Sequence, residues 1–134
     1  MSDEHDLELF SLERHYSTLN EWWVSWGWVP VMPEFLPESG VVATYLKKPV
    51  SAGFIYRTDS AYCLLEWIIS DPKSDKLVRR ESLGKLVPGL VELAKVMGFK
   101  SIFTTSKSVG LTGRLVEAGF QVSDREMTHL LRGL

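Results

Sequence analysis

Residues 61–69 restrict the folds open to this chain more than any other segment. Their apolar members form a nearly continuous stretch: Leu64, Leu65, Trp67, Ile68 and Ile69. Only Glu66 interrupts it. A strand of this composition is typically covered on both faces of a sheet. The rest of the chain therefore has to supply layers on both sides, and the most buried strand carries one carboxylate near its centre.

Shorter strand patterns precede this segment. Residues 41–46 and 52–57 are rich in β-branched and aromatic side chains, and only short turn sequences separate the three runs. Turns of this length favour antiparallel hairpins. Residues 7–10 predict a further short strand at the start of the chain.

A helix is predicted between the first strand and the hairpins. Its apolar stripe consists of Leu12, Tyr16, Leu19, Trp23 and Trp26, spaced by four and three residues. Gly27 ends the pattern, and the three prolines in residues 28–40 predict an ordered loop. Trp22 and Trp28 fall outside the stripe, so we expect them to pack against this loop or to line a groove.

The pattern becomes helical again from Leu83 to Met97. Ser82 is predicted to cap this helix and Gly98 to end it. Pro88 implies either a kink or a later start. Residues 101–105 predict a strand, residues 111–118 a short helix, and the last residues one or two strands ending at Leu131.

Length and charge exclude several classes of protein. The 134 residues predict a single domain, 1–134, and a net charge of −2 gives no field that would gather nucleic acid or an anionic membrane. No apolar run approaches a membrane span, and the acidic start differs from a secretory signal. A lone Cys63 allows no internal disulfide, and the three histidines, His5, His15 and His129, lack the spacing of a metal site. We therefore expect a cytoplasmic protein without a metal.

Three sequence segments resemble the Gcn5-related N-acetyltransferase (GNAT) family. Residues 65–72 (LEWIISDP) resemble its central strand, residues 96–103 (VMGFKSIF) its following helix end and strand, and residues 114–120 (RLVEAGF) its penultimate helix. The Trp-rich opening is similar to bacteriophage-encoded GNAT-like proteins. The resemblance implies an α/β domain of the acyl-CoA N-acyltransferase (GNAT) fold, an α+β mixed sheet of about six to seven mostly antiparallel strands with helices on both faces.

The resemblance also implies acetyl-CoA as cofactor. The family motif R/Q-x-x-G-x-G/A, whose amides hold the pyrophosphate, is best matched by residues 79–84, where Ser82 replaces the first glycine and the connection from the strand is about five residues longer. The implied cofactor residues are Trp67, Ile68, Ile69, Ser70, Arg79, Arg80, Ser82, Leu83, Gly84, Lys85 and Ser108. The alternative is that these basic residues form only a solvated start of a helix.

Glu66 occupies the position of a strand carboxylate that some family members use as the general base. Apolar neighbours raise the pKa of such a group, which suits proton abstraction, and the alternative is a structural glutamate paired with an arginine. The family's tyrosine acid falls at Leu115 and its asparagine at Ser108. The proton for the leaving thiolate would therefore come from Tyr62, Tyr56 or water. Trp22 and Trp28 would wall the acceptor site.

The resemblance thus implies acetyl transfer to an amine, on a small molecule or a protein. The competing hypothesis is a catalytically inactive GNAT-like binding or structural protein, such as a phage component. A homodimer or another protein partner fits either hypothesis, whereas nucleic acid and membrane do not. A phage-encoded chain would act in the host cytoplasm or the virion.

Overall fold

The computed structural model describes residues 4–134 and shows a five-stranded sheet in the order β1-β2-β3-β4-β5. The strands are β1 His5–Leu9, β2 Gly40–Tyr45, β3 Lys48–Tyr56, β4 Tyr62–Ser70 and β5 Ser101–Phe103. All neighbours are antiparallel except β4 and β5, which are parallel. The first three residues of the acidic start lie outside the described part of the chain.

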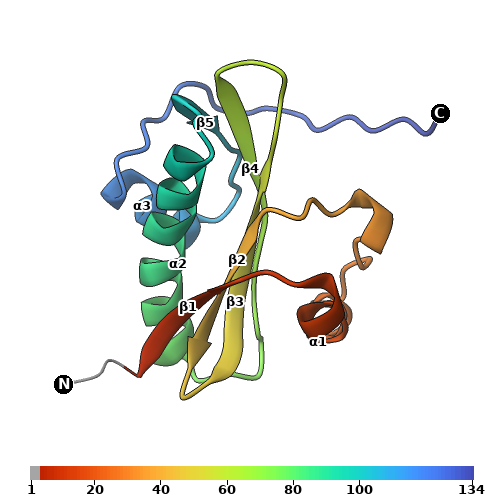
Figure 1. Cartoon of the computed structure of the whole chain (residues 1–134), viewed down its shortest axis with the longest axis vertical. Helices are drawn as coiled ribbons and strands as arrows, with labels where there is room; N and C mark the ends of the chain where they lie inside the picture. Colours follow the sequence, from red (N-terminus) through yellow and green to blue (C-terminus); the bar gives the residue numbers. More distant parts are fainter. Residues whose placement is uncertain (1–3) are drawn as a thin grey trace.

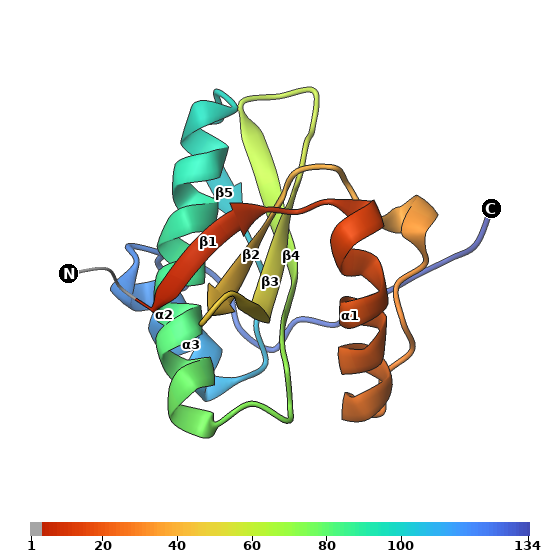
Figure 2. The same cartoon turned by 60° about the horizontal axis from the view of Figure 1, so that its bottom comes forward.

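Helices cover both faces of the sheet. Helix α1 Leu12–Trp26 packs on one face, and helices α2 Lys76–Val96 and α3 Val109–Glu117 lie on the other (Figures 1 and 2). A short 3₁₀ helix, η1 Pro33–Phe35, interrupts the proline-containing loop. Within residues 4–134, none of the helices combines the length and the apolarity that crossing a membrane requires. The predicted two-sided cover of the 61–69 strand is confirmed.

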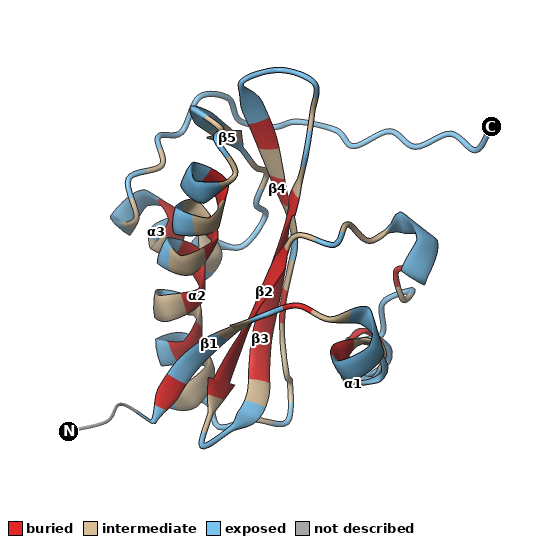
Figure 3. Ribbon diagram, in the orientation of Figure 1, coloured by how far each residue is buried: buried red, intermediate tan, exposed pale blue. Residues whose placement is uncertain are grey.

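The predicted strands at the end of the chain are absent, so the sheet has five strands where the sequence suggested six to seven. Residues 118–134 contain no helix or strand and are mostly exposed (Figure 3). Leu130 and Leu131 are 91% and 102% exposed. Because these side chains find no surface to bury against, nothing offsets the entropy lost in ordering a strand there.

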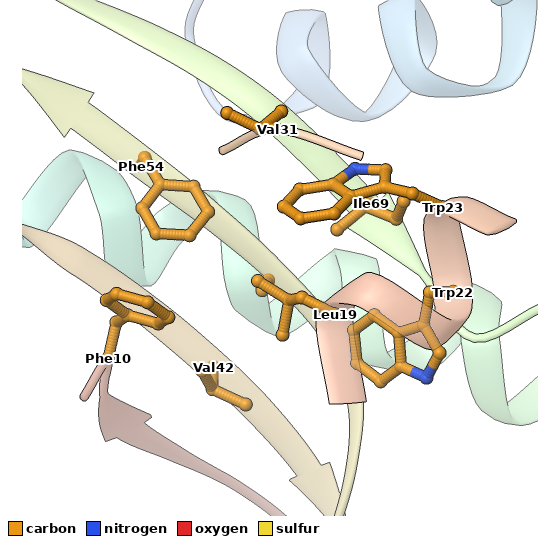
Figure 4. Packing of buried hydrophobic residues seen from close by; sticks show 9 residues of the cluster. Phe10, Leu19, Trp22, Trp23, Val31, Val42, Phe54 and Ile69 are labelled. Atoms are coloured by element: carbon orange, nitrogen blue, oxygen red, sulfur yellow. The ribbon is translucent and has the colours of Figure 1, made fainter. Parts of the chain in front are cut away.

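The core on the α1 face differs from the predicted helical stripe. Leu19, Trp22 and Trp23 pack against sheet residues that include Val42, Phe54 and Ile69 (Figure 4). Helix α1 is rotated so that His15 and Trp22 point inwards, while Leu12 is 47% exposed. His15 tolerates burial because its Nε2 lies 2.7 Å from Glu8 Oε1 and its Nδ1 accepts the Ser11 N–H. A stripe defined by apolar residues alone could not include this histidine.

Helix α2 starts earlier than predicted, at Lys76. Its N-cap is Asp75, whose carboxylate accepts the Leu77 N–H at 2.9 Å, and the prediction that Ser82 caps the helix is wrong. Ser82 is fully buried inside the helix, with its Oγ 2.6 Å from Ser51 Oγ on β3. Pro88 lies within α2, so of the two predicted alternatives the later start is wrong.

Candidate active site

The central strand β4 contains a bulge at the predicted site. Between the pairs Ala52–Ile69 and Phe54–Glu66, β3 advances two residues while β4 advances three. Trp67 lies in this bulge and has φ = 59°, a left-handed backbone conformation that an aromatic residue rarely adopts. Bulges of this kind re-aim side chains, and backbone outliers cluster at functional sites.

The bulge places Glu66 on the α1 face of the sheet. Glu66 lies directly opposite Phe54, which belongs to the core beneath α1, and directly opposed residues share a face. Burial raises the pKa of the half-buried Glu66, and the charge of His129 partly opposes this. No arginine or lysine among residues 4–134 forms an ion pair with Glu66, so the predicted structural pairing with an arginine is not found.

Tyr56 ties the bulge to the proline-containing loop. Its hydroxyl accepts the Trp67 Nε1–H at 2.7 Å and donates to the Phe35 carbonyl oxygen at 2.6 Å. Burial is the main reason that the pKa of Tyr56 is raised. Because both interactions engage the one hydroxyl, its proton is already committed to Phe35, and the residue is better placed to position Trp67 than to donate a proton to a ligand.

Strands β4 and β5 separate just before the bulge. Their pairing ends at Leu64 and Phe103, and Thr104 Oγ1 then donates to the Leu65 carbonyl oxygen at 2.7 Å. Beyond this point β4 has no strand neighbour on its β5 side among the described residues. The predicted cofactor residues Trp67, Ile68 and Ile69 therefore form an edge without a strand neighbour on this side, where a ligand could run parallel to the strand, whereas the carbonyl oxygen of Ser70 already accepts the Trp26 Nε1–H.

The start of α2 follows this edge after the five residues 71–75. The additional residues noted in the sequence form extra helical turns ahead of Ser82 rather than a longer loop. Ser82 is buried against β3, so its side chain does not reach the surface where a cofactor would lie, and Leu83, Gly84 and Lys85 lie in the third turn of α2. The amides at the start of the helix belong instead to residues 76–79.

Basic side chains surround this helix start. Lys73, Lys76 and Arg80 are exposed, and Arg79 donates to the Pro72 carbonyl oxygen at 3.2 Å. The Arg79 guanidinium also lies 5.8 Å from the centre of the Trp26 ring. Cationic side chains and helix N-termini both favour anions, whereas the Asp75 carboxylate opposes them.

The predicted catalytic Tyr62 lies apart from Glu66, and the predicted cofactor residue Ser108 serves as a helix cap. Tyr62 precedes Glu66 by four residues, which is about 13 Å along a strand, so their side chains do not meet. Ser108 caps α3, its Oγ accepting the Leu111 N–H at 3.2 Å.

Leu115, at the position of the family tyrosine, is buried on α3, and no proton donor stands there. Cys63 is a fully buried core thiol whose pKa burial raises.

The two tryptophans predicted for the acceptor wall have different environments. Trp22 is 4% exposed and belongs to the core, so it cannot contact a ligand at the surface. Trp28 is 54% exposed and stacks on Trp26, with ring centroids 5.4 Å apart. Trp26 in turn donates its Nε1–H to the Ser70 carbonyl oxygen at 2.7 Å. Trp28 and Trp26 thus stand beside the end of β4.

The segment after α3 brings His129 to the same part of the sheet. The chain passes β5 and β4 and ends on the α1 side (Figures 1 and 2). His129 Nε2 lies 3.1 Å from Thr105 Oγ1, directly after β5. A cavity of about 1030 Å³ separates β5 and α3 from this segment, and no residue of β4 lines it. The cavity therefore lies beside the β4 edge and not along it.

Sequence patterns did not identify Thr104, Thr105 and His129 as members of the site. Their proximity depends on the path of an irregular segment, and hydrophobic periodicity carries no signal for such a path. The start of α2 at Lys76, in contrast, could have been predicted from the sequence, because aspartate is a preferred N-cap residue and Asp75 directly precedes it.

Solved structures of other proteins share the fold of this chain. The sequence matches no protein-family model and no curated protein. Among solved structures it is similar to a glucosamine-6-phosphate N-acetyltransferase from Arabidopsis thaliana, with a TM-score of 0.62, 12% identity and 97% and 100% of the two chains covered. An aminoglycoside acetyltransferase from an uncultured soil metagenomic sample, in complex with sisomicin, gives a TM-score of 0.67 at 11% identity, with 98% and 97% covered.

A third similar structure is N-acetylglutamate synthase from Neisseria gonorrhoeae complexed with coenzyme A and N-acetyl-glutamate. Its TM-score is 0.65 at 15% identity, and the match covers 92% of this chain and 30% of that one. The chain therefore has the α+β fold of the GNAT acetyltransferases, with a five-stranded mixed sheet.

Proposed function

We propose that this protein transfers an acetyl group from acetyl-CoA to an amine. The observation that carries the proposal is the β4 bulge, which combines an unpaired strand edge with the half-buried Glu66. The open edge offers backbone groups to the pantetheine amides, and the start of α2 with Lys73, Lys76 and Arg80 offers charge to the phosphates. The fold shared with acetyltransferases supports this reaction class.

In the proposed reaction the acceptor amine attacks the thioester carbonyl carbon while Glu66 removes a proton from the amine nitrogen. The C–S bond then breaks, and the coenzyme A thiolate leaves and takes up a proton. A carboxylate whose pKa is raised towards neutrality is a better base than an ordinary glutamate. The acceptor would lie on the α1 face, where Glu66 and Trp67 point, and Trp28 is the predicted wall residue that remains accessible.

The names of two similar structures support an amine acceptor. One is an aminoglycoside acetyltransferase and the other a glucosamine-6-phosphate N-acetyltransferase, and this chain would act on an amine of a small molecule or a protein. A catalytically inactive protein, for example in a bacteriophage, is the alternative that the following experiment separates.

Glu66→Gln tests the proposal because it keeps the shape and removes the base. We expect acetyl transfer to fall about 10²-fold or more, with coenzyme A affinity nearly unchanged. Glu92→Gln, on the exposed side of α2, is the matched control and should retain full turnover.

Thiol release from acetyl-CoA with a panel of amines provides the rate, and melting temperature confirms folding. Undiminished turnover in a folded Glu66→Gln protein would remove Glu66 as the base, and a wild type that turns over no amine would favour the inactive alternative.

A further inference from the structure

We propose that His129 is the general acid that protonates the coenzyme A thiolate as it leaves. This role rests on the proposed acetyl transfer and extends it. The need for a donor arises because Leu115 stands where the family has a tyrosine, Tyr62 lies too far along β4, and the Tyr56 hydroxyl donates to Phe35. An alkyl thiolate leaves more readily when a proton reaches the sulfur.

A contact with Thr105, two residues after the end of β5, places His129 beside the point where β4 and β5 separate. Thr104 Oγ1 binds the carbonyl oxygen of Leu65, the residue before Glu66. The next residue, Thr105, holds the His129 ring through its Oγ1, 3.1 Å from Nε2. His129 thus contacts the residue next to Thr104, and Thr104 in turn contacts β4 at Leu65.

The charges around His129 fit a proton-carrying group. The charge of His129 lowers the pKa of Glu66 and so partly opposes the larger effect of burial. The other charged side chains that line the neighbouring cavity with His129 are Lys107, Asp124, Arg125 and Glu126. This set contains two cations and two anions, so the wall of the cavity carries no excess charge of either sign beside His129.

The proposed proton transfers balance. The amine nitrogen forms a bond to the carbonyl carbon and gives one proton to Glu66, the C–S bond breaks, and the sulfur takes one proton from the His129 imidazolium. The products are an amide, coenzyme A thiol, protonated Glu66 and neutral His129. Return of one proton from Glu66 to His129, directly or through water, restores both residues.

His129→Gln tests this role, because glutamine can still bond to Thr105 but cannot act as an acid. We expect kcat to fall about tenfold or more with KM for acetyl-CoA within about twofold, and the decline of kcat at high pH to disappear. Added imidazole should partly restore turnover in His129→Ala. Thr128→Val, on the preceding residue, is the matched control and should leave kcat and its pH profile unchanged.

The two proposals fail in different ways. An active wild type together with a His129→Gln protein of unchanged kcat and unchanged pH profile would overturn the role of His129 alone. A kcat that falls without any change of pH profile and without imidazole rescue would show a structural effect and would also overturn it. A wild type that transfers acetyl to no amine would overturn the proposed function, and this role with it.

Discussion

At the scale of single residues, the chemistry of the site depends on how one carboxylate is buried. Glu66 lies in an apolar strand and lacks an ion-pair partner among residues 4–134, so its charged form is disfavoured. Sequence composition alone predicted this direction, because the neighbours of Glu66 in β4 are nearly all apolar. The bulge that turns Glu66 and Trp67 onto the α1 face was not predictable, because strand alternation carries no signal for one inserted residue.

The raised pKa of Glu66 predicts a specific pH dependence. Because the base has to be ionised, kcat/KM should rise with pH along a limb that lies above the ordinary glutamate pKa of about 4.3. Stability should change in the opposite direction. The folded protein binds the proton more tightly than the unfolded chain, so the stability that Glu66 contributes is present below about pH 4.3 and lost as pH rises through the raised pKa.

Kinetic and melting profiles of wild type and Glu66→Gln check both effects. The variant should lose the acidic limb of kcat/KM and should lose less stability between the ordinary and raised pKa values. If the wild-type limb falls at or below the ordinary glutamate range, burial does not tune this residue and the account of Glu66 as an activated base is wrong.

At the scale of elements, the charge at the start of α2 should control how tightly the protein binds the phosphates of coenzyme A. Asp75 caps the helix with a carboxylate, where an anionic ligand would otherwise meet the helix amides. Asp75→Asn keeps a side-chain cap and removes the negative charge. We expect coenzyme A to bind several-fold more tightly at low ionic strength and the gain to shrink in salt.

Isothermal titration of coenzyme A at two salt concentrations measures this change. Asp59→Asn, in the exposed turn between β3 and β4, removes the same charge elsewhere and is the matched control. Ser82→Ala should leave affinity unchanged, because Ser82 bonds only to Ser51 inside the protein. Equal gains for Asp75→Asn and Asp59→Asn would mean that only net charge matters, and the phosphates would then lie away from the start of α2.

Elements were predicted best where one periodicity held over many residues. Strands β2 and β4 lie within one residue of the predicted runs 41–46 and 61–69, and α1 spans the predicted stripe from Leu12 to Trp26, whereas β3 begins at Lys48, before the predicted run 52–57. The start of α2 was missed because residues 76–81 contain only two apolar side chains, Leu77 and Val78, and two adjacent residues do not establish a helical periodicity. The terminal strands were predicted from short apolar runs that the folded chain leaves exposed.

At the scale of the whole molecule, layers that are far apart in the sequence converge on one strand edge. The sheet contributes Glu66 and the open edge of β4, the α2 face contributes the basic helix start, and the terminal segment contributes His129. The order of elements could be predicted from the sequence and led to the fold class. The position of the terminal segment could not, because contacts such as the one between His129 and Thr105 leave no trace in hydrophobic periodicity.

A coenzyme A titration followed by amide NMR tests most directly whether the cofactor lies along the open edge of β4. We expect saturable shifts at residues 67–70 and 73–79, with those of the turn between β2 and β3 at Leu46 and Lys47 unchanged. An absence of shifts at saturating coenzyme A, or shifts confined to residues away from β4 and the start of α2, would contradict the account.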